Sequence, residues 1–196
     1  MPYHHGNLQV ALIDSAVELA AADGADAVAL REVARRVGVS HNAAYRHFTD
    51  REALMRAVAA RALTGFGESM RDRIAAAAQG ADVESSYDRL AASGRSYVEY
   101  ATEHAQLFRA ICAFPMGSVQ PDTDVVHPYQ QLTERLDDLV TVGAITPERR
   151  GNAEIAACSA VHGFAMLTLD GPFRNVSSAE REQGLAQVLR VVRFGI

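Results

Sequence analysis

The stretch that decides the fold is Leu30–Leu54, LREVARRVGVSHNAAYRHFTDREAL. Apolar residues recur at helical spacing over residues 30–37, which predicts a short amphipathic helix. Gly38 can end that helix in the left-handed conformation, and the Ser40 hydroxyl can cap the helix that follows. The second helix, expected over residues 41–48, has apolar residues on one face and polar or aromatic residues on the others. The stretch therefore predicts a helix-turn-helix, a motif whose second helix can enter a DNA groove.

Taken alone, this pattern leaves a DNA-binding motif and an ordinary corner between two helices equally open. The segments around it favour DNA binding. YHHGNL over residues 3–8, LREVARRVGVS over 30–40, and YRHF and REAL over 45–54 have the order and spacing of the N-terminal domain of TetR family transcription regulators, which the chain resembles. AVHGFAMLTLDG over residues 160–171 is similar to the HG-containing helix of one type of TetR C-terminal domain.

The composition favours an all-helical chain, since Ala is abundant, Trp is absent and aromatic residues are few. We expect an all-α, nine-helix TetR-like architecture, with a helix-turn-helix DNA-binding domain over residues 1–62 and a helical effector-binding and dimerisation domain over residues 63–196. The helices are expected at about 7–22, 30–37, 41–48, 51–78, 85–102, 104–113, 125–142, 147–169 and 178–194. No segment has the composition of a transmembrane helix or a signal peptide, so we expect a cytoplasmic protein.

The net charge of −5 does not by itself indicate a nucleic-acid binder. Residues 1–60 contain six arginines and seven acidic residues, so even the expected DNA-binding domain is not basic in sum. Residues 35–47, however, contain three arginines, two histidines and no acid. We therefore expect a local basic patch to meet the phosphate backbone, with a shallower salt dependence than that of a strongly basic protein.

The recognition helix carries the expected base contacts. The resemblance implies that the contacting positions are Ser40, His41, Asn42, Ala43, Tyr45, Arg46 and His47. Asn42 can offer a donor and an acceptor to adenine, and His41 can donate to a guanine acceptor. Ala43 is small enough to allow close approach and to touch a thymine methyl group.

The flanking positions are expected to bind the DNA backbone. Tyr45 and His47 are predicted to contact phosphates, and Arg51, where the family usually has Lys, is predicted to clamp a phosphate from the start of the fourth helix. Arg31 can reach the backbone of the opposite strand. Two alternatives stay open. The Tyr45 side chain can instead be half-buried against its neighbours, and the Arg46 side chain can be solvated without contacting DNA. For Arg46 the solvated interpretation is preferred.

Two features at the N-terminal side qualify this picture. Tyr3, His4 and His5 precede the first helix and can form an arm that follows the DNA backbone. The family commonly has Ser or Thr at the position of Ala29, where it caps the second helix and can contact a phosphate. Ala29 can do neither. Asp26 can serve as the cap instead if the helix begins earlier.

The last two helices are the expected dimer interface. A single reading head covers few base pairs, so two-fold pairing on a palindromic site is expected. The eighth helix has a wide face of apolar and small residues: Ile155, Ala156, Ser159, Ala160, Gly163, Met166 and Leu167. Apolar residues nearly encircle the ninth: Leu185, Val188, Leu189, Val191 and Val192. Packing inside one domain is the alternative, and the resemblance favours a four-helix bundle across a two-fold axis.

The resemblance also implies a small-molecule cavity among the middle helices. The candidate lining residues are Phe66, Met70, Tyr97, Tyr100, His104, Phe108, Cys112, Met116, Tyr129, His162 and Met166. Apolar and aromatic walls with few polar groups suit a ligand pocket, although the same residues at helical spacing also suit a plain core. The loop over residues 114–122 can be a lid or an ordinary connection.

Enzyme chemistry is not expected, because the chain has no Gly-rich phosphate loop, no HExxH and no nucleophile elbow. No cofactor is therefore expected, and no metal, since no second ligand cluster lies near His4 and His5 in the sequence. Cys112 and Cys158 are too few for a disulfide framework and are expected as buried thiols in a reducing cytosol. The alternative to a ligand-responsive regulator, most simply a repressor, is a helical ligand-binding or protein-interaction module without operator binding.

Overall fold

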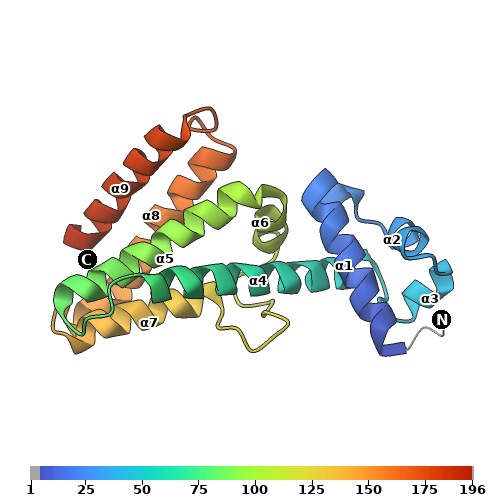
Figure 1. The fold of residues 1–196 in the computed structure, drawn as a ribbon, viewed down its shortest axis with the longest axis horizontal. Helices are drawn as coiled ribbons and strands as arrows, with labels where there is room; N and C mark the ends of the chain where they lie inside the picture. Colours follow the sequence, from blue (N-terminus) through green and yellow to red (C-terminus); the bar gives the residue numbers. More distant parts are fainter. Residues whose placement is uncertain (1–4, 196) are drawn as a thin grey trace. The chain divides into compact units, whose positions relative to one another are not determined.

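A computed structural model describes residues 5–195, with side chains from residue 8 onward. This part of the chain contains nine α-helices, one short 3-10 helix and no strand, so the predicted all-α, nine-helix fold is confirmed (Figure 1). The elements are α1 His5–Asp23, η1 Ala25–Ala27, α2 Leu30–Val37, α3 His41–Tyr45, α4 Arg51–Ala76, α5 Val83–Glu103, α6 Ala105–Cys112, α7 Pro128–Thr141, α8 Pro147–Leu169 and α9 Ser178–Gly195.

Helix starts follow the capping chemistry of the sequence. The Asp50 carboxylate accepts the Ala53 N–H at 2.8 Å and caps α4. At α9, Ser177 and Glu180 bond each other's backbone N–H groups, which is a capping box. At α5 the sequence predicts Ser85 or Ser86 as the cap, but the helix begins earlier and Asp82 caps it, accepting the Ser85 N–H at 2.9 Å. Asp82 is the cap rather than a serine because its carboxylate also accepts a hydrogen bond from the Ser85 hydroxyl.

The described chain forms two compact units, and each is built from two separate segments. The first unit comprises residues 5–65 and 104–125, and the second comprises residues 66–103 and 126–195. Helix α4 continues through the junction without a break, although the sequence, with Gly65 and Gly67, makes a bend there plausible. The sequence predicts a boundary between residues 62 and 63, and the first segment of the first unit ends at Gly65. The first unit also includes α6, which is distant in the sequence.

The core of the first unit explains why α6 belongs to it. Side chains from α1, α2, α3 and the start of α4 form one buried cluster, and Ala110 of α6 belongs to it. Leu107 and Phe114 pack against the same cluster from the side. A single cut along the sequence cannot show this, because α6 is 39 residues or more beyond the end of the first segment.

The second unit has its own core between α5, α7, α8 and α9. Leu136, Leu139 and Ala157 are almost fully buried there. Gly94 on α5 permits the close approach of α9, because a Cβ atom at this position would lie 2.6 Å from the Leu189 Cδ2 atom. The two cysteines do not have the predicted burial: Cys112, next to the exposed loop, is exposed and Cys158 is half-buried.

Candidate nucleic-acid interface

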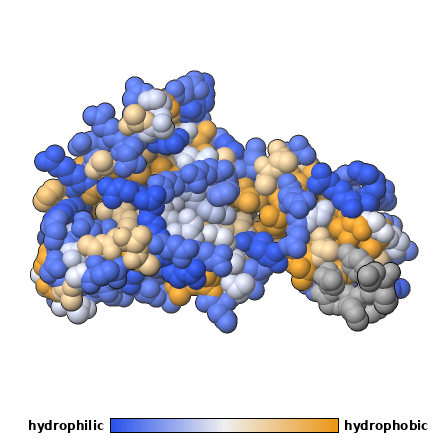
Figure 2. All heavy atoms as spheres, in the orientation of Figure 1, coloured by the Kyte–Doolittle hydropathy of each residue, from blue (hydrophilic) through white to orange (hydrophobic). Residues whose placement is uncertain are grey.

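The turn between α2 and α3 has the predicted geometry. Gly38 has φ 79° and ψ 29°, the left-handed conformation, and the Val39 N–H donates to the Ala34 carbonyl at 3.0 Å. Ser40 has an extended backbone, and its Oγ accepts the Ala43 N–H at 3.2 Å. The helix-turn-helix prediction is therefore confirmed. Figure 2 shows hydrophobic residues beside hydrophilic ones in the region of α2 and α3.

The recognition helix α3 is shorter than predicted, ending at Tyr45 instead of Phe48. The backbone continues in a turn, with the Phe48 N–H still donating to the Ala44 carbonyl at 3.0 Å. Ala44 and Phe48 are buried, which fixes the inner face of the helix. His41, Asn42, Tyr45 and Arg46 are exposed, and Ala43 and His47 are half-buried.

Tyr45 is available at the surface. Its side chain is 44% exposed, and its ring meets the His41 ring edge-on at 5.0 Å between centroids. With just over half of its area covered, Tyr45 fits both the phosphate contact and the half-buried packing that the sequence leaves open. The ring contact orders two neighbouring residues on the exposed face of α3.

The basic patch is weaker than the sequence window suggests. Glu32, which lies just before residues 35–47, accepts hydrogen bonds from Arg35 at 2.7 and 2.9 Å and lies 3.7 Å from Arg36. The hydrogen bond with Arg35 lowers the pKa of Glu32 and raises that of Arg35. Glu32 thus compensates one of the three arginine charges of α2. A search for acids three and four residues before each arginine would have shown this.

The start of α2 departs from simple capping. Ala29 occupies the N-cap position in an extended conformation without a side-chain cap, and Asp26 lies in η1 rather than at a cap. Arg51, predicted to clamp a phosphate, instead donates from Nε to the Val28 carbonyl at 2.9 Å and from Nη2 to the Ala25 carbonyl at 2.6 Å. Arg31 is exposed. Tyr3 and His4 lie outside the described residues, as does the side chain of His5.

Helices α8 and α9 each have large apolar side chains exposed at the surface. Ile155 and Val191 are each 70% exposed, and Phe194, which the sequence interpretation omits, is 73% exposed. On α8, Ala156, Ser159 and Leu167 are also exposed, whereas Ala160, Gly163 and Met166 are half-buried. On α9, Leu185, Leu189 and Val192 pack inside the unit, and Val188 is half-buried. The nearly encircling apolar pattern of α9 therefore divides into an inner and an outer face.

Four of the predicted ligand residues form one aromatic cluster in the second unit. The Phe66 ring stacks on Tyr100 at 4.5 Å and meets Tyr97 edge-on at 5.2 Å. The Tyr97 hydroxyl is 2.8 Å from the His162 Nδ1 atom, so α5 and α8 share a hydrogen bond. Burial raises the pKa of the Tyr100 phenol to about 12. Met70 is buried and Met166 is half-buried in the same unit.

The other predicted ligand residues have different surroundings. Tyr129 donates its hydroxyl to Glu154, which links α7 to α8. Four belong to the first unit: His104, Phe108, Cys112 and Met116. Of these Phe108 is buried, whereas Met116 is 68% exposed in the loop after α6.

The described residues offer neither a metal site nor a membrane span. No group of three or more His, Cys, Asp or Glu side chains there could hold a metal ion. No helix in the same part of the chain has the length and apolar character needed to cross a membrane.

Two family models match the chain. Residues 12–58 match the model described as bacterial regulatory proteins, tetR family, and residues 90–192, more than half of the chain, match the tetracyclin repressor-like C-terminal domain. The chain belongs to the TetR family. The first model covers the helix-turn-helix, and the second covers α6 to α8 and most of α5 and α9, so the family assignment holds for both units. No curated protein sequence matches the chain.

Solved structures share the TetR fold. A Rhodococcus sp. RHA1 protein of unknown function has a TM-score of 0.80 at 25% identity, over 100% of this chain and 98% of its own. A TetR variant from Acinetobacter baumannii AYE, solved with minocycline, has a TM-score of 0.62 at 18% identity, over 99% of this chain and 96% of its own. The TetR family regulator PfmR from Thermus thermophilus has a TM-score of 0.59 at 19% identity over 92% and 96%.

Proposed function

We propose that this TetR family protein is a ligand-responsive transcriptional repressor that binds a palindromic DNA operator as a homodimer. The observation that carries the proposal is the exposed face of α3, where His41, Asn42 and Tyr45 stand on a helix whose other face is buried through Ala44 and Phe48. Polar side chains on a rigidly packed helix suit base recognition, because their direction is set before DNA arrives.

The contacts divide by chemistry. Asn42 pairs with adenine, His41 donates to guanine, and Ala43 lies against a thymine methyl group. Tyr45, His47 and Arg31 bind phosphates, and Ser40 adds a backbone contact besides its capping role. Arg46 is exposed, and we assign it no DNA contact because solvation alone accounts for its position. With Arg35 paired with Glu32, Arg31 is the arginine assigned to a phosphate, so specificity depends on these placed side chains.

Dimerisation uses the outer surface of α8 and α9. Burying Ile155, Val191 and Phe194 against a second copy would remove most of their apolar area from water, at about 1.5–3 kcal/mol for each large side chain. Gly163 supports close helix approach, since a Cβ atom built there meets nothing within 4 Å in a single copy. Two reading heads would then lie about 34–36 Å apart on B-DNA.

The effector is proposed to bind at the aromatic cluster of Phe66, Tyr97, Tyr100 and His162. Stacked rings suit an apolar or planar small molecule, and the Tyr97–His162 pair offers polar atoms to orient it. Because α4 belongs to both units, a ligand that favours one arrangement of the two reading heads can shift the population and weaken operator binding.

The DNA contacts are tested on an operator found by genomic footprinting with the purified protein. The double variant Asn42→Ala and Tyr45→Ala should lose operator binding, because it removes a base contact and a phosphate contact. Arg46→Ala is the matched control and should bind as the wild type does. Unchanged affinity in the double variant would refute the contact assignment. A wild-type protein that protects no genomic site would favour the alternative of a ligand-binding or interaction module.

The dimer is tested by light scattering at micromolar concentration. Ile155→Asp combined with Val191→Asp should give a monomer, because two buried carboxylates would face an apolar partner surface. Val83→Asp, which changes an equally apolar exposed residue at the start of α5, is the control. A monomeric wild type, or a double variant that stays dimeric, would contradict the proposed interface.

A further inference from the structure

Arg51, the first residue of α4, reaches back to the segment that precedes α2. Its Nε donates to the Val28 carbonyl at 2.9 Å, and its Nη2 donates to the Ala25 carbonyl at 2.6 Å. The same Ala25 carbonyl accepts the Val28 N–H at 3.1 Å, so the guanidinium binds the backbone of the η1 turn at both ends. Nη2 also lies 3.9 Å from an Asp26 carboxylate oxygen. Two of the three guanidinium nitrogens, Nε and Nη2, thus donate to the protein, while the side chain as a whole is 49% exposed.

The start of α2 needs such support. Its N-cap is Ala29, which offers no side-chain oxygen to the free N–H groups of the first turn. The first backbone hydrogen bond of the helix is the one from Val33 N–H to the Ala29 carbonyl at 3.0 Å. Val28, directly before the cap, has a fully buried side chain. Arg51 thus holds from outside a helix start that lacks its own cap.

The contact also closes the helix-turn-helix on itself. Val28 and Arg51 are 23 residues apart, and α2, the turn and α3 lie between them. Since α3 packs on α2 through the core that contains Ala34 and Ala44, the direction of α3 follows from the direction of α2. A change at the start of α2 is therefore passed on to the residues that face DNA.

We propose that Arg51 is a positioning residue for operator recognition, which fixes the start of α2 and through it the orientation of α3. This inference rests on the proposed operator binding. A positioning role for Arg51 and a phosphate contact by Arg51 predict different effects on DNA binding. A phosphate contact acts on every DNA sequence and contributes to the salt dependence, whereas the orientation of α3 affects only the cognate sequence.

The experiment measures fluorescence anisotropy of two labelled duplexes from about 50 to about 200 mM salt. One duplex is selected by the wild type from a random-sequence pool, and the other is its scrambled counterpart. Arg51→Met and Arg51→Lys are compared with Arg56→Met, which removes an equal charge five residues further along α4, and with Arg31→Met as the phosphate reference. Active fractions are fixed by titration at stoichiometric concentration, so that partial unfolding does not count as lost affinity.

We expect Arg51→Met to weaken binding to the selected duplex about tenfold, leave the scrambled duplex unchanged and keep the salt slope, because a charge-assisted hydrogen bond is lost inside the protein. Arg51→Lys should behave like Arg51→Met, since one ammonium cannot bind both carbonyls in the same geometry. Arg31→Met should weaken both duplexes and lower the salt slope by about one. A lower slope in Arg51→Met, equal weakening of both duplexes, full affinity in Arg51→Lys, or no change would each overturn the proposal.

Amide hydrogen exchange of the free protein gives a readout that needs no DNA. In Arg51→Met the Val28 and Val33 amides should exchange faster, while Leu12 in α1 keeps its protection. Unchanged exchange at Val28 and Val33 would overturn the positioning role. If the wild type selects no sequence from the pool, the proposed operator binding fails, and the exchange data still decide whether Arg51 holds the start of α2.

Discussion

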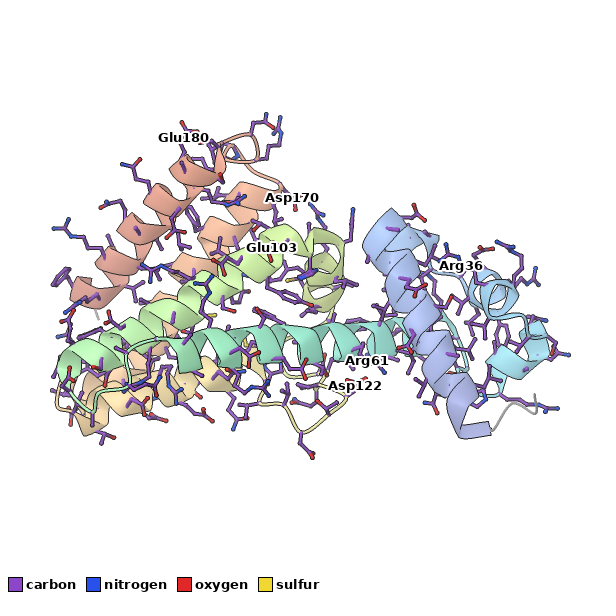
Figure 3. The ribbon with its side chains drawn as sticks, in the orientation of Figure 1. Arg36, Arg61, Glu103, Asp122, Asp170 and Glu180 are labelled. Carbon is purple, nitrogen blue, oxygen red and sulfur yellow. The ribbon has the colours of Figure 1, made fainter. Side chains whose placement is uncertain are left out.

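Asp122, in the loop between α6 and α7, is bound to α4 within the first unit. Its carboxylate accepts from Arg61 Nε and Thr64 Oγ1, and its N–H donates to Thr64 Oγ1 at 3.0 Å. Figure 3 shows Arg61 and Asp122 next to each other. Arg61 also bonds Asp14 of α1, so one guanidinium joins three segments. Asp122→Asn keeps the shape of the side chain and removes its charge. We predict that this change destabilises the protein measurably.

The expected magnitude follows from exposure. The Asp122 and Arg61 side chains are 25% and 32% exposed. A hydrogen bond to a charged group contributes about 1.5–3 kcal/mol when sheltered, and a fully exposed ion pair about 0–1 kcal/mol. A pair of intermediate exposure should contribute about 1.5 kcal/mol to the free energy of unfolding. For a chain of this length that lowers Tm by about 3–5 °C.

The effect should depend on pH. Burial acts to raise the pKa of Asp122, but hydrogen bonds from Thr64 and Arg61 outweigh it, and the pKa in the folded state is lowered. A carboxyl group with a lowered folded pKa stabilises the protein above its unfolded pKa and loses that contribution as pH falls through the folded pKa. The penalty of Asp122→Asn should be complete at about pH 7 and shrink below about pH 4.

Thermal unfolding followed by circular dichroism at both pH values checks this reasoning. Asp124→Asn, in the same exposed loop, is the control and should leave Tm within about 1 °C, as surface substitutions usually do. The reasoning is refuted if Asp122→Asn leaves Tm unchanged at neutral pH, or if its penalty persists undiminished in acid.

Three further substitutions have defined outcomes in chemical denaturation. Gly38→Ala meets no atom within 4 Å but must adopt φ 79°, so it should cost about 1–2 kcal/mol from backbone strain alone, and a neutral result would mean that the turn relaxes. Ser40→Ala removes the acceptor of the Ala43 N–H and should cost about 1 kcal/mol, whereas Ser40→Gly should cost only a few tenths. Gly94→Ala places a methyl group 2.6 Å from Leu189 and should cost about 1–3 kcal/mol, an expectation that a wild-type midpoint would contradict.

The local structure of the reading head could be predicted from adjacent residues. Gly38 and Ser40 set the turn because a left-handed conformation and an N-cap depend on a few neighbouring atoms. The apolar spacing of residues 30–37 likewise fixed the bounds of α2. The end of α3 could not be predicted as well from the sequence. The turn after Tyr45 keeps one helical hydrogen bond and differs from a helix only in geometry.

Partners distant in the sequence could not be predicted. The sequence offered Arg51 as a charge next to the recognition helix, and only the fold brings it to the carbonyls of Ala25 and Val28. The same holds for Asp122, which has no pattern of its own and gains its role from Arg61. Main-chain carbonyls and loop carboxylates carry no periodic signal, so the sequence alone cannot rank them as partners.

The amino-acid sequence by itself determined the helix-turn-helix, the all-α class and the resemblance to the TetR family, since capping and helical periodicity act over a few residues. The tertiary structure decided which side chains remain available. It paired Arg35 with Glu32, bonded Arg51 to the carbonyls of Ala25 and Val28, and divided the apolar residues of α9 between the core and an exposed face. Burial and pairing depend on what the folded chain places opposite each residue, and that is a property of the whole fold.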